Sequence, residues 1–352
     1  MQDVAIVSFV QSDCVRYAGA QNEVELIMPV VQAALKEAGL NSVQDVDFTC
    51  SGSCDYQQGA AFAFVAGVDA LGAVPPIKES HVEMDAAWAL YESWLKIQMG
   101  QAESALIYGF GKSSPGQLSN VLSLQLDPYY LAPLGVDTIS LAAMQARSLL
   151  ESGEVSEADL AEVVVNSRAN AKNNPHAQLS GDFTVEQLLA EPEMVSPLRK
   201  HDCCPISDGA AAMIICTVEK AKEMDKPYAV IKGIDHRIET HHVTLRDLSR
   251  SPSVEIAAEK AGVHDAAVDV AEIYAPFSHQ EIIVKRALGL DNSVAINPSG
   301  GVLAGHLFMA SGLSRVGEVA KRIIAGEYKR GVAHATSGPC LQQNMITVLE
   351  GM

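Results

Sequence analysis

The sequence predicts an α/β fold in which short apolar strands alternate with amphipathic helices. The chain has 352 residues, of which 48% are hydrophobic and 19% are charged, which is enough for a large buried core. Short apolar, β-branched runs recur along it, and stretches with helical spacing that stop at a glycine separate them. Alternation of this kind is typical of a sheet that helices cover on both faces.

The first part of the chain begins with one such alternation. The expected elements are strands at 4–10, 46–50 and 104–109 and helices at 23–38 and 85–99. Gly39 and Gly100 stand just past the two helices, where a glycine usually ends a helix.

The second part repeats the order of the first, although residue identity is hardly repeated. We expect strands at 211–216, 229–234, 270–274, 294–296 and 345–349 and helices at 253–261, 278–288 and 311–324. The charged stretch 220–226 and the proline after it mark a boundary, so we divide the chain into 1–222 and 223–352. A loop-like insertion is expected over about 110–200, because Pro, Ser and Gly around 113–137 favour irregular structure.

Composition excludes several classes of protein. The formal net charge of −18 argues against a nucleic-acid or anionic-membrane partner, although it leaves room for a local phosphate site. The seven cysteines include no pair of Cys-x-x-Cys units, so we expect free thiols and no zinc site. The sequence has neither a signal-peptide pattern nor a membrane-length apolar run, and we expect a cytoplasmic protein.

The most informative motif runs from Asn297 to Gly301 and is followed by Gly305 and His306. Two adjacent glycines allow the backbone to approach a ligand or another backbone closely. A histidine at the edge of such a turn, just ahead of a helix, is well placed for acid/base chemistry. The alternative is a glycine turn with a solvated histidine.

Four stretches of the chain resemble the thiolase superfamily, especially its sterol-carrier-protein-2-type branch. They are 297–306, 204–212, 272–281 and 332–340, and in order and spacing they cover nearly the whole chain. The resemblance implies a thiolase fold of two similar halves in a five-layered αβαβα arrangement. It also implies a CoA thioester as substrate, no cofactor or metal, and a homodimer or a heterodimer with a thiolase-like chain.

One departure from the family concerns its nucleophile. In true thiolases a cysteine opens the buried helix of the first half, whereas this chain has no cysteine between Cys54 and Cys203. Glu83 or Asp85 stands in the corresponding place. A carboxylate there is either a helix cap or a general base. With either role, thiolysis through an acyl-cysteine is not expected.

A second departure concerns the stretch that begins at Tyr274. Tyr274, Ala275, Pro276 and Phe277 resemble the Tyr-x-x-Phe of thiolase-fold steroid side-chain aldolases, which also lack the nucleophilic cysteine and cleave a β-hydroxyacyl-CoA. This implies that the Tyr274 hydroxyl takes or returns a proton at the β-hydroxyl of the substrate. The alternative is a tyrosine that caps the strand end. His279 either orients Tyr274 or lies in the solvated first turn of a helix, and we favour the solvated position.

The remaining candidates also follow from the resemblance. His306 matches the loop histidine that holds the thioester oxygen, with backbone N–H groups of Gly300, Gly301 and Gly338 beside it. Cys340 and His334 are candidates for the C-terminal catalytic loop, and Cys340 is alternatively a small buried residue. The run 201–204 spells a His-Asp-Cys motif at the wrong place in the chain, and we interpret it as structural.

Three hypotheses for function remain open. The first is carbon–carbon bond cleavage in a lipid or steroid acyl-CoA by a retro-aldol route, as in steroid catabolism, with a DUF35-type OB-fold protein as a partner. The second is an acyl-CoA acyltransferase or thiolase that uses Cys340. The third is a non-catalytic acyl-CoA-binding subunit paired with an active thiolase-fold chain.

We predict that the chain forms no acyl-enzyme in a thiolase assay, because no cysteine occupies the nucleophile's place. Incubation with acetoacetyl-CoA and CoA is expected to give no burst, and intact-protein mass spectrometry is expected to show no adduct. An acyl adduct on Cys340 would contradict this prediction and favour the second hypothesis.

Overall fold

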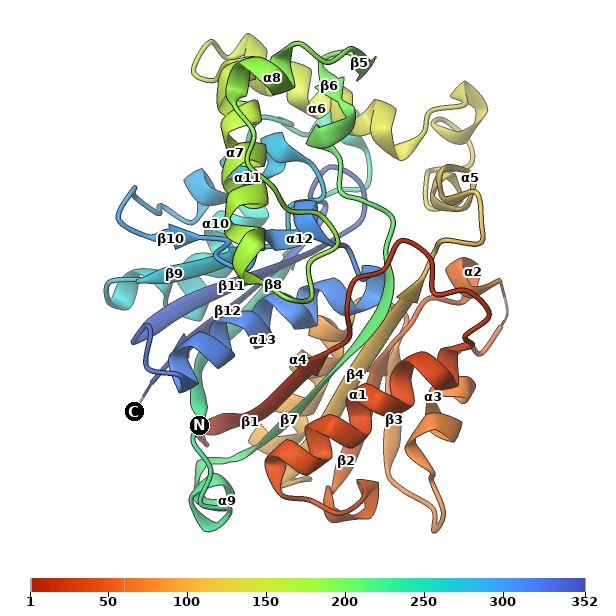
Figure 1. Cartoon of the computed structure of the whole chain (residues 1–352), viewed down its shortest axis with the longest axis vertical. Helices are drawn as coiled ribbons and strands as arrows, with labels where there is room; N and C mark the ends of the chain where they lie inside the picture. The colour runs from red at the N-terminus through yellow and green to blue at the C-terminus, as the bar shows by residue number, and fades with distance from the viewer. Residues whose placement is uncertain (1, 60, 352) are drawn as a thin grey trace.

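The computed structural model describes residues 2–59 and 61–351, and ten of its strands form one sheet (Figure 1). The strand order is β10-β9-β11-β12-β8-β1-β7-β4-β2-β3. These strands are β1 (Val4–Gln11), β2 (Phe48–Gly52), β3 (Glu79–Val82), β4 (Ser104–Lys112), β7 (Asp208–Thr217), β8 (Ala229–Ile238), β9 (Val270–Ile273), β10 (Ala295–Ile296), β11 (Arg330–Ser337) and β12 (Gln343–Glu350). A separate small hairpin joins β5 (Glu193–Val195) to β6 (Leu198–Arg199).

The sheet consists of two halves with the same topology. Counted outward from the centre, the first half runs β1, β7, β4, β2, β3 and the second runs β8, β12, β11, β9, β10. In each half the two inner pairs are antiparallel and the two outer pairs are parallel. The halves meet where β1 pairs with β8 over only three residue pairs. The change of half falls between β7 and β8, and the boundary at residue 222 stays a prediction.

Helices cover both outer faces and also fill the space between the halves. Helices α1 and α3 pack on the first half, α10 and α11 pack on the second, and α4 and α13 lie together between them. The resulting order is helix, sheet, helix, sheet, helix, so the expected fold class is confirmed. The helices are α1 (Glu23–Ala38), α2 (Asp55–Gln58), α3 (Phe64–Leu71), α4 (Ala86–Gln98), α9 (Val218–Glu223), α10 (Pro252–Ala261), α11 (Ser278–Ala287), α12 (Gly301–Ala304) and α13 (Ser311–Ile324).

Local sequence explains most of these elements. Helix α1 begins at a capping box of Asn22 and Glu25 and ends at Gly39, whose φ of 78° is the left-handed conformation that glycine adopts most easily. Each expected strand and helix is present: the helices at 23–38 and 311–324 have the expected ends, and the other elements have shifted ends. One segment differs from expectation: the loop expected at 332–340 is largely strand β11, and only its last residues form a turn.

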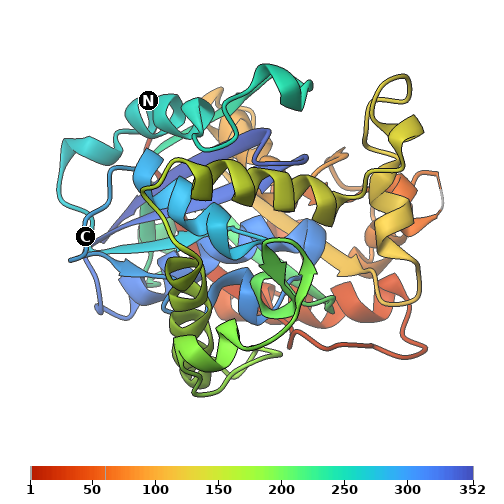
Figure 2. The same ribbon diagram turned by 90° about the horizontal axis from the view of Figure 1, so that it is seen from above.

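The insertion over 110–200 is more regular than its composition predicted. It contains α5 (Leu118–Ser123), α6 (Thr138–Glu151), α7 (Glu157–Asn170) and α8 (Val185–Leu189). Asp137 caps α6, and Ser156 with Asp159 forms a capping box at α7, which explains where both helices begin. Figures 1 and 2 show the insertion at one end of the molecule, above the second half of the sheet. None of the helices in the described residues has the length and apolar character needed to span a membrane.

We predict that the protein self-associates, or pairs with a similar chain, through the edge strand β3. Thr49 N–H donates to Lys78 O and Ser53 N–H donates to Val82 O, so the backbone groups of the intervening Glu79 and His81 point away from β2. An edge of this kind favours pairing with another chain. Sedimentation velocity is expected to show a dimer.

The matched variants are His81→Pro, which removes the outward N–H, and His81→Ala, which keeps it. Both lose the stacking of His81 on Phe64, where the ring centroids are 3.6 Å apart. Only the proline variant is expected to shift toward monomer. A folded wild-type monomer in dilute solution would contradict the prediction.

Candidate active site

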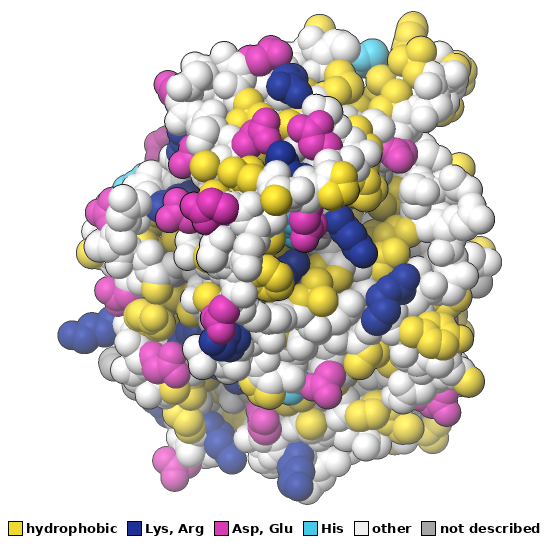
Figure 3. Space-filling model, turned by 45° about the horizontal axis from the view of Figure 1, so that its top comes forward, with side chains coloured by type: hydrophobic (Ala, Val, Ile, Leu, Met, Phe, Trp, Pro, Cys, Tyr) yellow, Lys and Arg dark blue, Asp and Glu magenta, His cyan; other side chains and the backbone are white. Residues whose placement is uncertain are grey.

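A cavity of about 1010 Å³ lies where the insertion covers the second half of the sheet. Its lining combines α5, α6 and α7 with the loop before β7 and the segments that follow β9, β11 and α12. Most of the wall is apolar, and Figure 3 shows apolar and basic side chains together on this face. The apolar lining includes Leu118, Leu122, Leu126, Ile139, Ala142, Val164, Leu179, Leu188, Ile206, Phe277, Phe308 and Met309.

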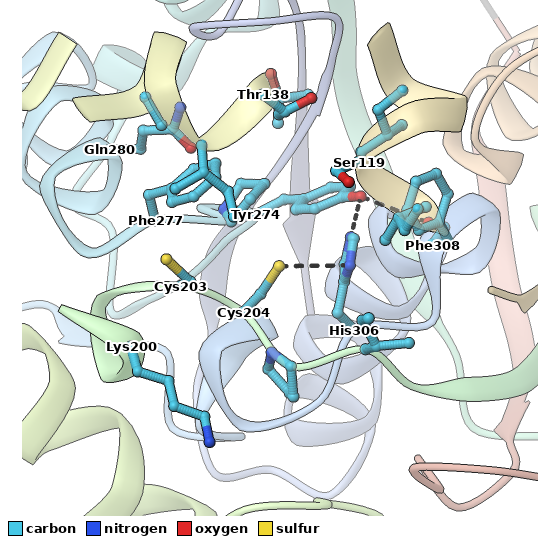
Figure 4. Close-up of a pocket in the computed structure, with 18 of the residues that line it drawn as sticks. Ser119, Thr138, Lys200, Cys203, Cys204, Tyr274, Phe277, Gln280, His306 and Phe308 are labelled. Carbon is cyan, nitrogen blue, oxygen red and sulfur yellow. Dashed lines mark hydrogen bonds between the residues drawn. The ribbon is translucent and has the colours of Figure 1, made fainter. Parts of the chain in front are cut away.

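Tyr274 and His306 form a close pair in this cavity. Tyr274 directly follows β9, and His306 lies in the loop between α12 and the short helical turn Phe308–Ala310. The Tyr274 hydroxyl oxygen is 2.7 Å from Nε2 of His306, and both side chains are buried (Figure 4). The structure thus brings together the two leading candidates from the sequence, which are 32 residues apart in the chain.

The other ring nitrogen of His306 contacts Cys204, which the sequence analysis set aside. Cys204 Sγ lies 3.5 Å from Nδ1, and Figure 4 shows the thiol and the phenol reaching different nitrogens of the same ring. Cys204 belongs to the segment between the helical turn Lys200–Asp202 and β7. No local pattern in the sequence indicates this contact, because it joins residues 102 positions apart.

Burial keeps all three groups in their neutral forms near neutral pH. It lowers the pKa of His306 to about 4, with Arg315 acting in the same direction. It raises the pKa of the Cys204 thiol to about 12 and the pKa of the Tyr274 phenol well above its usual value of 10. The chain of contacts is therefore thiol, imidazole and phenol rather than an ion pair.

The turn from Asn297 to Gly301 holds the backbone in place and does not line the cavity. Gly300 N–H donates to Asn297 O at 2.8 Å, and Gly301 N–H donates to Ser299 Oγ at 3.1 Å. Neither glycine contributes to the cavity wall. The expectation that Gly300 and Gly301 face the thioester is therefore corrected, because their N–H groups serve the turn itself.

A buried ion pair between Glu272 and Arg315 also holds this turn in place. Glu272 on β9 accepts hydrogen bonds from the backbone N–H and the hydroxyl of Ser299, at 2.9 and 2.7 Å, and pairs with the Arg315 guanidinium. Arg315 also donates to Ser299 Oγ at 2.6 Å. A buried charge pair needs such additional hydrogen bonds to offset its desolvation. The ends of β9, α12 and α13 are thereby held together beneath His306.

Asp85 and Glu83 differ sharply in their surroundings. Asp85 caps α4, and its carboxylate accepts N–H bonds from Ala87, Gly312 and Leu313 at 2.8, 2.8 and 3.2 Å. Burial raises its pKa to about 7, although these three donors act in the opposite direction. Glu83 is exposed, does not line the cavity and accepts the N–H of Asp55. Asp85 lines the cavity, so it is the carboxylate at the site, and its hydrogen bonds are those of a cap.

Two other candidates occupy different places from those expected. His279 is buried, not solvated, and its Nε2 lies 3.2 Å from Gln145 Oε1. His334 is buried on β11 with Nε2 2.9 Å from Asn344 Oδ1, outside the cavity wall. Burial lowers the pKa of His279 to about 3 and of His334 to about 4. Both histidines are therefore neutral and held by amide side chains.

Cys340 and Gly338 do line the cavity. The Cys340 thiol donates to Leu141 O at 3.5 Å, and burial raises its pKa to about 12. Gly338 has a φ of 76°, so it turns the chain just after β11 in a conformation that suits glycine. Of the three glycines predicted to bind substrate, Gly338 is placed at the cavity.

Basic groups stand at the cavity despite the negative net charge. Arg16 and Lys200 are exposed and line the cavity, and Arg168 lines it from α7 while donating to Leu303 O. Within residues 2–59 and 61–351, no group of three or more His, Cys, Asp or Glu side chains is arranged to hold a metal ion.

Comparison with known proteins agrees with this architecture. Residues 228–348 match the family model described as the thiolase C-terminal domain. In structural comparison, a structure described as the Ltp2-ChsH2(DUF35) aldolase has a TM-score of 0.83 at 19% identity, covering 99% of this chain and 98% of that one. The chain has the thiolase fold. Human mitochondrial 3-ketoacyl-CoA thiolase in complex with CoA gives a TM-score of 0.78 at 18% identity, covering 100% and 98%.

Sequence comparison finds relatives among acetyl-CoA acetyltransferases and sterol carrier protein 2. The acetyl-CoA acetyltransferase of Methanocaldococcus jannaschii is 28% identical over 354 residues, which cover 91% of this chain and 89% of that protein. Sterol carrier protein 2 of Gallus gallus is 26% identical over 78% of this chain, and the match spans 57% of that protein.

We predict that Asp85→Ala lowers the free energy of unfolding by about 2–4 kcal/mol, because three buried N–H groups at two helix N-termini lose their acceptor. Asp85→Asn keeps one acceptor oxygen and is expected to lose less. Urea unfolding followed by circular dichroism measures both.

Glu92→Ala in the same helix is the control, since it removes only the partly exposed pair with Lys96 at 3.7 Å and is expected to cost about 0.5 kcal/mol or less. Equal stability of Asp85→Ala and Glu92→Ala would show that Asp85 does not join the two helices.

Proposed function

We propose that this chain is a thiolase-fold enzyme that cleaves a carbon–carbon bond of a lipid or steroid acyl-CoA by a retro-aldol route. The observation that carries the proposal is the hydrogen bond between the Tyr274 hydroxyl and His306, at 2.7 Å, inside a large apolar cavity. Acid/base chemistry needs such a pair, and nucleophilic chemistry needs a thiol that helix α4 does not carry.

In the proposed reaction Tyr274 takes the proton of the substrate β-hydroxyl and passes its own proton to Nε2 of His306. The bond between the α- and β-carbons breaks, the β-carbon becomes a carbonyl, and the electron pair moves to the thioester enolate. A free phenolate is not required, which matters because burial raises the pKa of Tyr274. His306 thus acts in the proton path, since both of its ring nitrogens already have partners.

The cavity suits a long thioester. Its volume of about 1010 Å³ and apolar lining fit a bulky acyl group. Arg16 and Lys200 are available for the phosphate groups of CoA. We assign the thioester oxygen to the turn at Gly338, which takes over the role expected of Gly300 and Gly301.

The names of the acetyltransferase relatives favour a second candidate, an acyltransferase that uses Cys340. The Cys340 thiol does not favour this candidate. Its S–H donates to a backbone carbonyl, and burial disfavours the thiolate that would act as nucleophile. The third candidate, a non-catalytic acyl-CoA-binding subunit, gives no reason for a buried Tyr–His pair aimed into the cavity.

A partner of the DUF35 OB-fold type is part of the proposal. One structure with this fold is described as the Ltp2-ChsH2(DUF35) aldolase. In this chain the segment around α5 exposes large apolar side chains beside the cavity: Leu124, Tyr129, Tyr130 and Leu134, each at least 66% exposed. An exposed group of this kind favours a protein contact. The assay below is therefore run with and without a DUF35 protein.

We predict that Tyr274→Phe lowers turnover of a 3-hydroxyacyl-CoA with a tertiary β-carbon by about 10²–10⁴-fold while its Kd hardly changes, because only the hydroxyl is lost. The turnover of His306→Ala is expected to fall by a similar factor. The double variant is expected to lose less than the product of the two, since both act on one proton path.

Tyr91→Phe is the matched control, because Tyr91 stacks on Trp94 outside the cavity. Full activity of Tyr274→Phe would rule out the assigned role. Turnover by neither the wild type nor its mixture with a DUF35 protein, together with tight acyl-CoA binding, would favour the non-catalytic subunit.

A further inference from the structure

His306 connects two hydrogen-bonding groups that come from separate loops and line the same cavity. Its Nε2 lies 2.7 Å from the Tyr274 oxygen, and its Nδ1 lies 3.5 Å from Cys204 Sγ (Figure 4). The proposed bond cleavage uses the Tyr274 end. It also leaves an enolate whose α-carbon must receive a proton, and Tyr274 cannot supply it while taking one.

We propose that Cys204 is a catalytic acid that delivers this proton to the α-carbon through the chain Tyr274–His306–Cys204. The inference rests on the retro-aldol function proposed above and adds the residue that completes the reaction. A β-hydroxyl oxygen and an α-carbon are only two bonds apart, so a bound substrate can meet the phenol and the thiol at the same time.

The protons balance along this chain. At the start Tyr274 O–H donates to Nε2 of His306, and Nδ1–H points at Cys204. The substrate hydroxyl gives its proton to the Tyr274 oxygen, Tyr274 gives its proton to Nε2, Nδ1 gives its proton to Sγ, and the thiol gives its proton to the α-carbon. At the end all three groups again carry one exchangeable proton, and only the tautomer of His306 has changed. After the products leave, water takes one proton from Tyr274 and gives one to Cys204, while Nε2 returns its proton to Tyr274 and Cys204 returns its proton to Nδ1, which restores the first tautomer.

The structure provides partners for both tautomers. With Nδ1 protonated, the ring donates to Cys204 and accepts from Tyr274. With Nε2 protonated, the ring donates to the Tyr274 oxygen, and the phenolic hydrogen can turn to Phe308 O, which lies 3.5 Å away. Cys204 S–H then donates to Nδ1. Each tautomer is therefore satisfied without moving a heavy atom.

Electrostatics favour transfer along the whole chain over charge separation within it. The neutral forms of the imidazole, the thiol and the phenol are all stabilised by burial. A thiolate–imidazolium pair would carry two opposite charges in this apolar surrounding. A coupled shift of protons creates no lasting charge on any of the three side chains.

Hydrogen bonds from backbone N–H groups hold Cys204, His306 and Tyr274 next to one another. Cys204 N–H donates to Pro276 O at 2.8 Å, so the thiol segment is tied to the turn that carries Tyr274. His306 N–H donates to Ser207 Oγ at 3.0 Å, which ties the imidazole to the same segment. Cys340 also lines the cavity, but its thiol is directed at Leu141 O. Cys204 is therefore the thiol that this arrangement connects to His306.

The test uses 3-hydroxy-2,3-dimethylbutyryl-CoA, whose cleavage gives acetone and propionyl-CoA, in D₂O with the full chain alone and mixed with a DUF35 protein. The wild type is expected to release 2-deuteriopropionyl-CoA as a single enantiomer, because a fixed acid protonates one face. Cys204→Ala is expected to cleave about 10²–10³-fold more slowly and to give racemic product, since solvent must supply the deuteron. The Kd for propionyl-CoA is expected to stay the same. Cys204→Ser, which keeps a donor at this position, is expected to retain a single enantiomer.

Cys203→Ala is the matched control, since the neighbouring thiol donates to Arg199 O and does not contact His306. It is expected to preserve the stereochemistry. If the wild type cleaves the probe and Cys204→Ala gives the same rate and the same enantiomer, the role of Cys204 is wrong while the lyase function stands. If the wild type neither cleaves the probe nor exchanges the α-hydrogens of propionyl-CoA with D₂O, both proposals are wrong.

Discussion

The carboxylate of Asp85 is the interaction on which the centre of this structure depends. It caps α4 from the first half and accepts two N–H groups at the start of α13 from the second half. The strands of the two halves also pair between β1 and β8, over three residue pairs. One buried side chain thus aligns the N-termini of the two central helices at the cavity. Asp85, one of the two carboxylates expected in place of a nucleophile, thus joins helices from the two halves.

The glycine turn that stood out in the sequence has a similar structural role. Its residues are satisfied by one another and by Glu272 and Arg315 beneath them. His306 follows this turn in the chain, so the turn determines where His306 lies. The turn therefore contributes by placing the residue that comes after it, and the residues that face the cavity come from other segments.

Local periodicity in the sequence was sufficient to predict the repeated strands and helices, because each half forms them from short continuous segments. The insertion was expected to be irregular, since its first part is rich in turn residues. Asp137, Ser156 and Asp159 are nevertheless typical N-terminal capping residues, and they mark the start of two helices. Motifs indicated Tyr274 and His306 as candidates, and both line the cavity, while their roles stay predictions. No motif indicated Cys204, because its contact with His306 joins distant parts of the chain. The burial of His279 likewise depends on packing against α6, which no local pattern gives.

The repeated topology of the two halves has a consequence for how such a protein can change. Strand β3 leads to α4, and β10 leads, at the matching place in the repeat, to α13. The first of these connections carries the cap Asp85, and the second carries His306 in the cavity wall. A repeated framework permits this difference, because one half can keep the architecture while the side chains of the other half change.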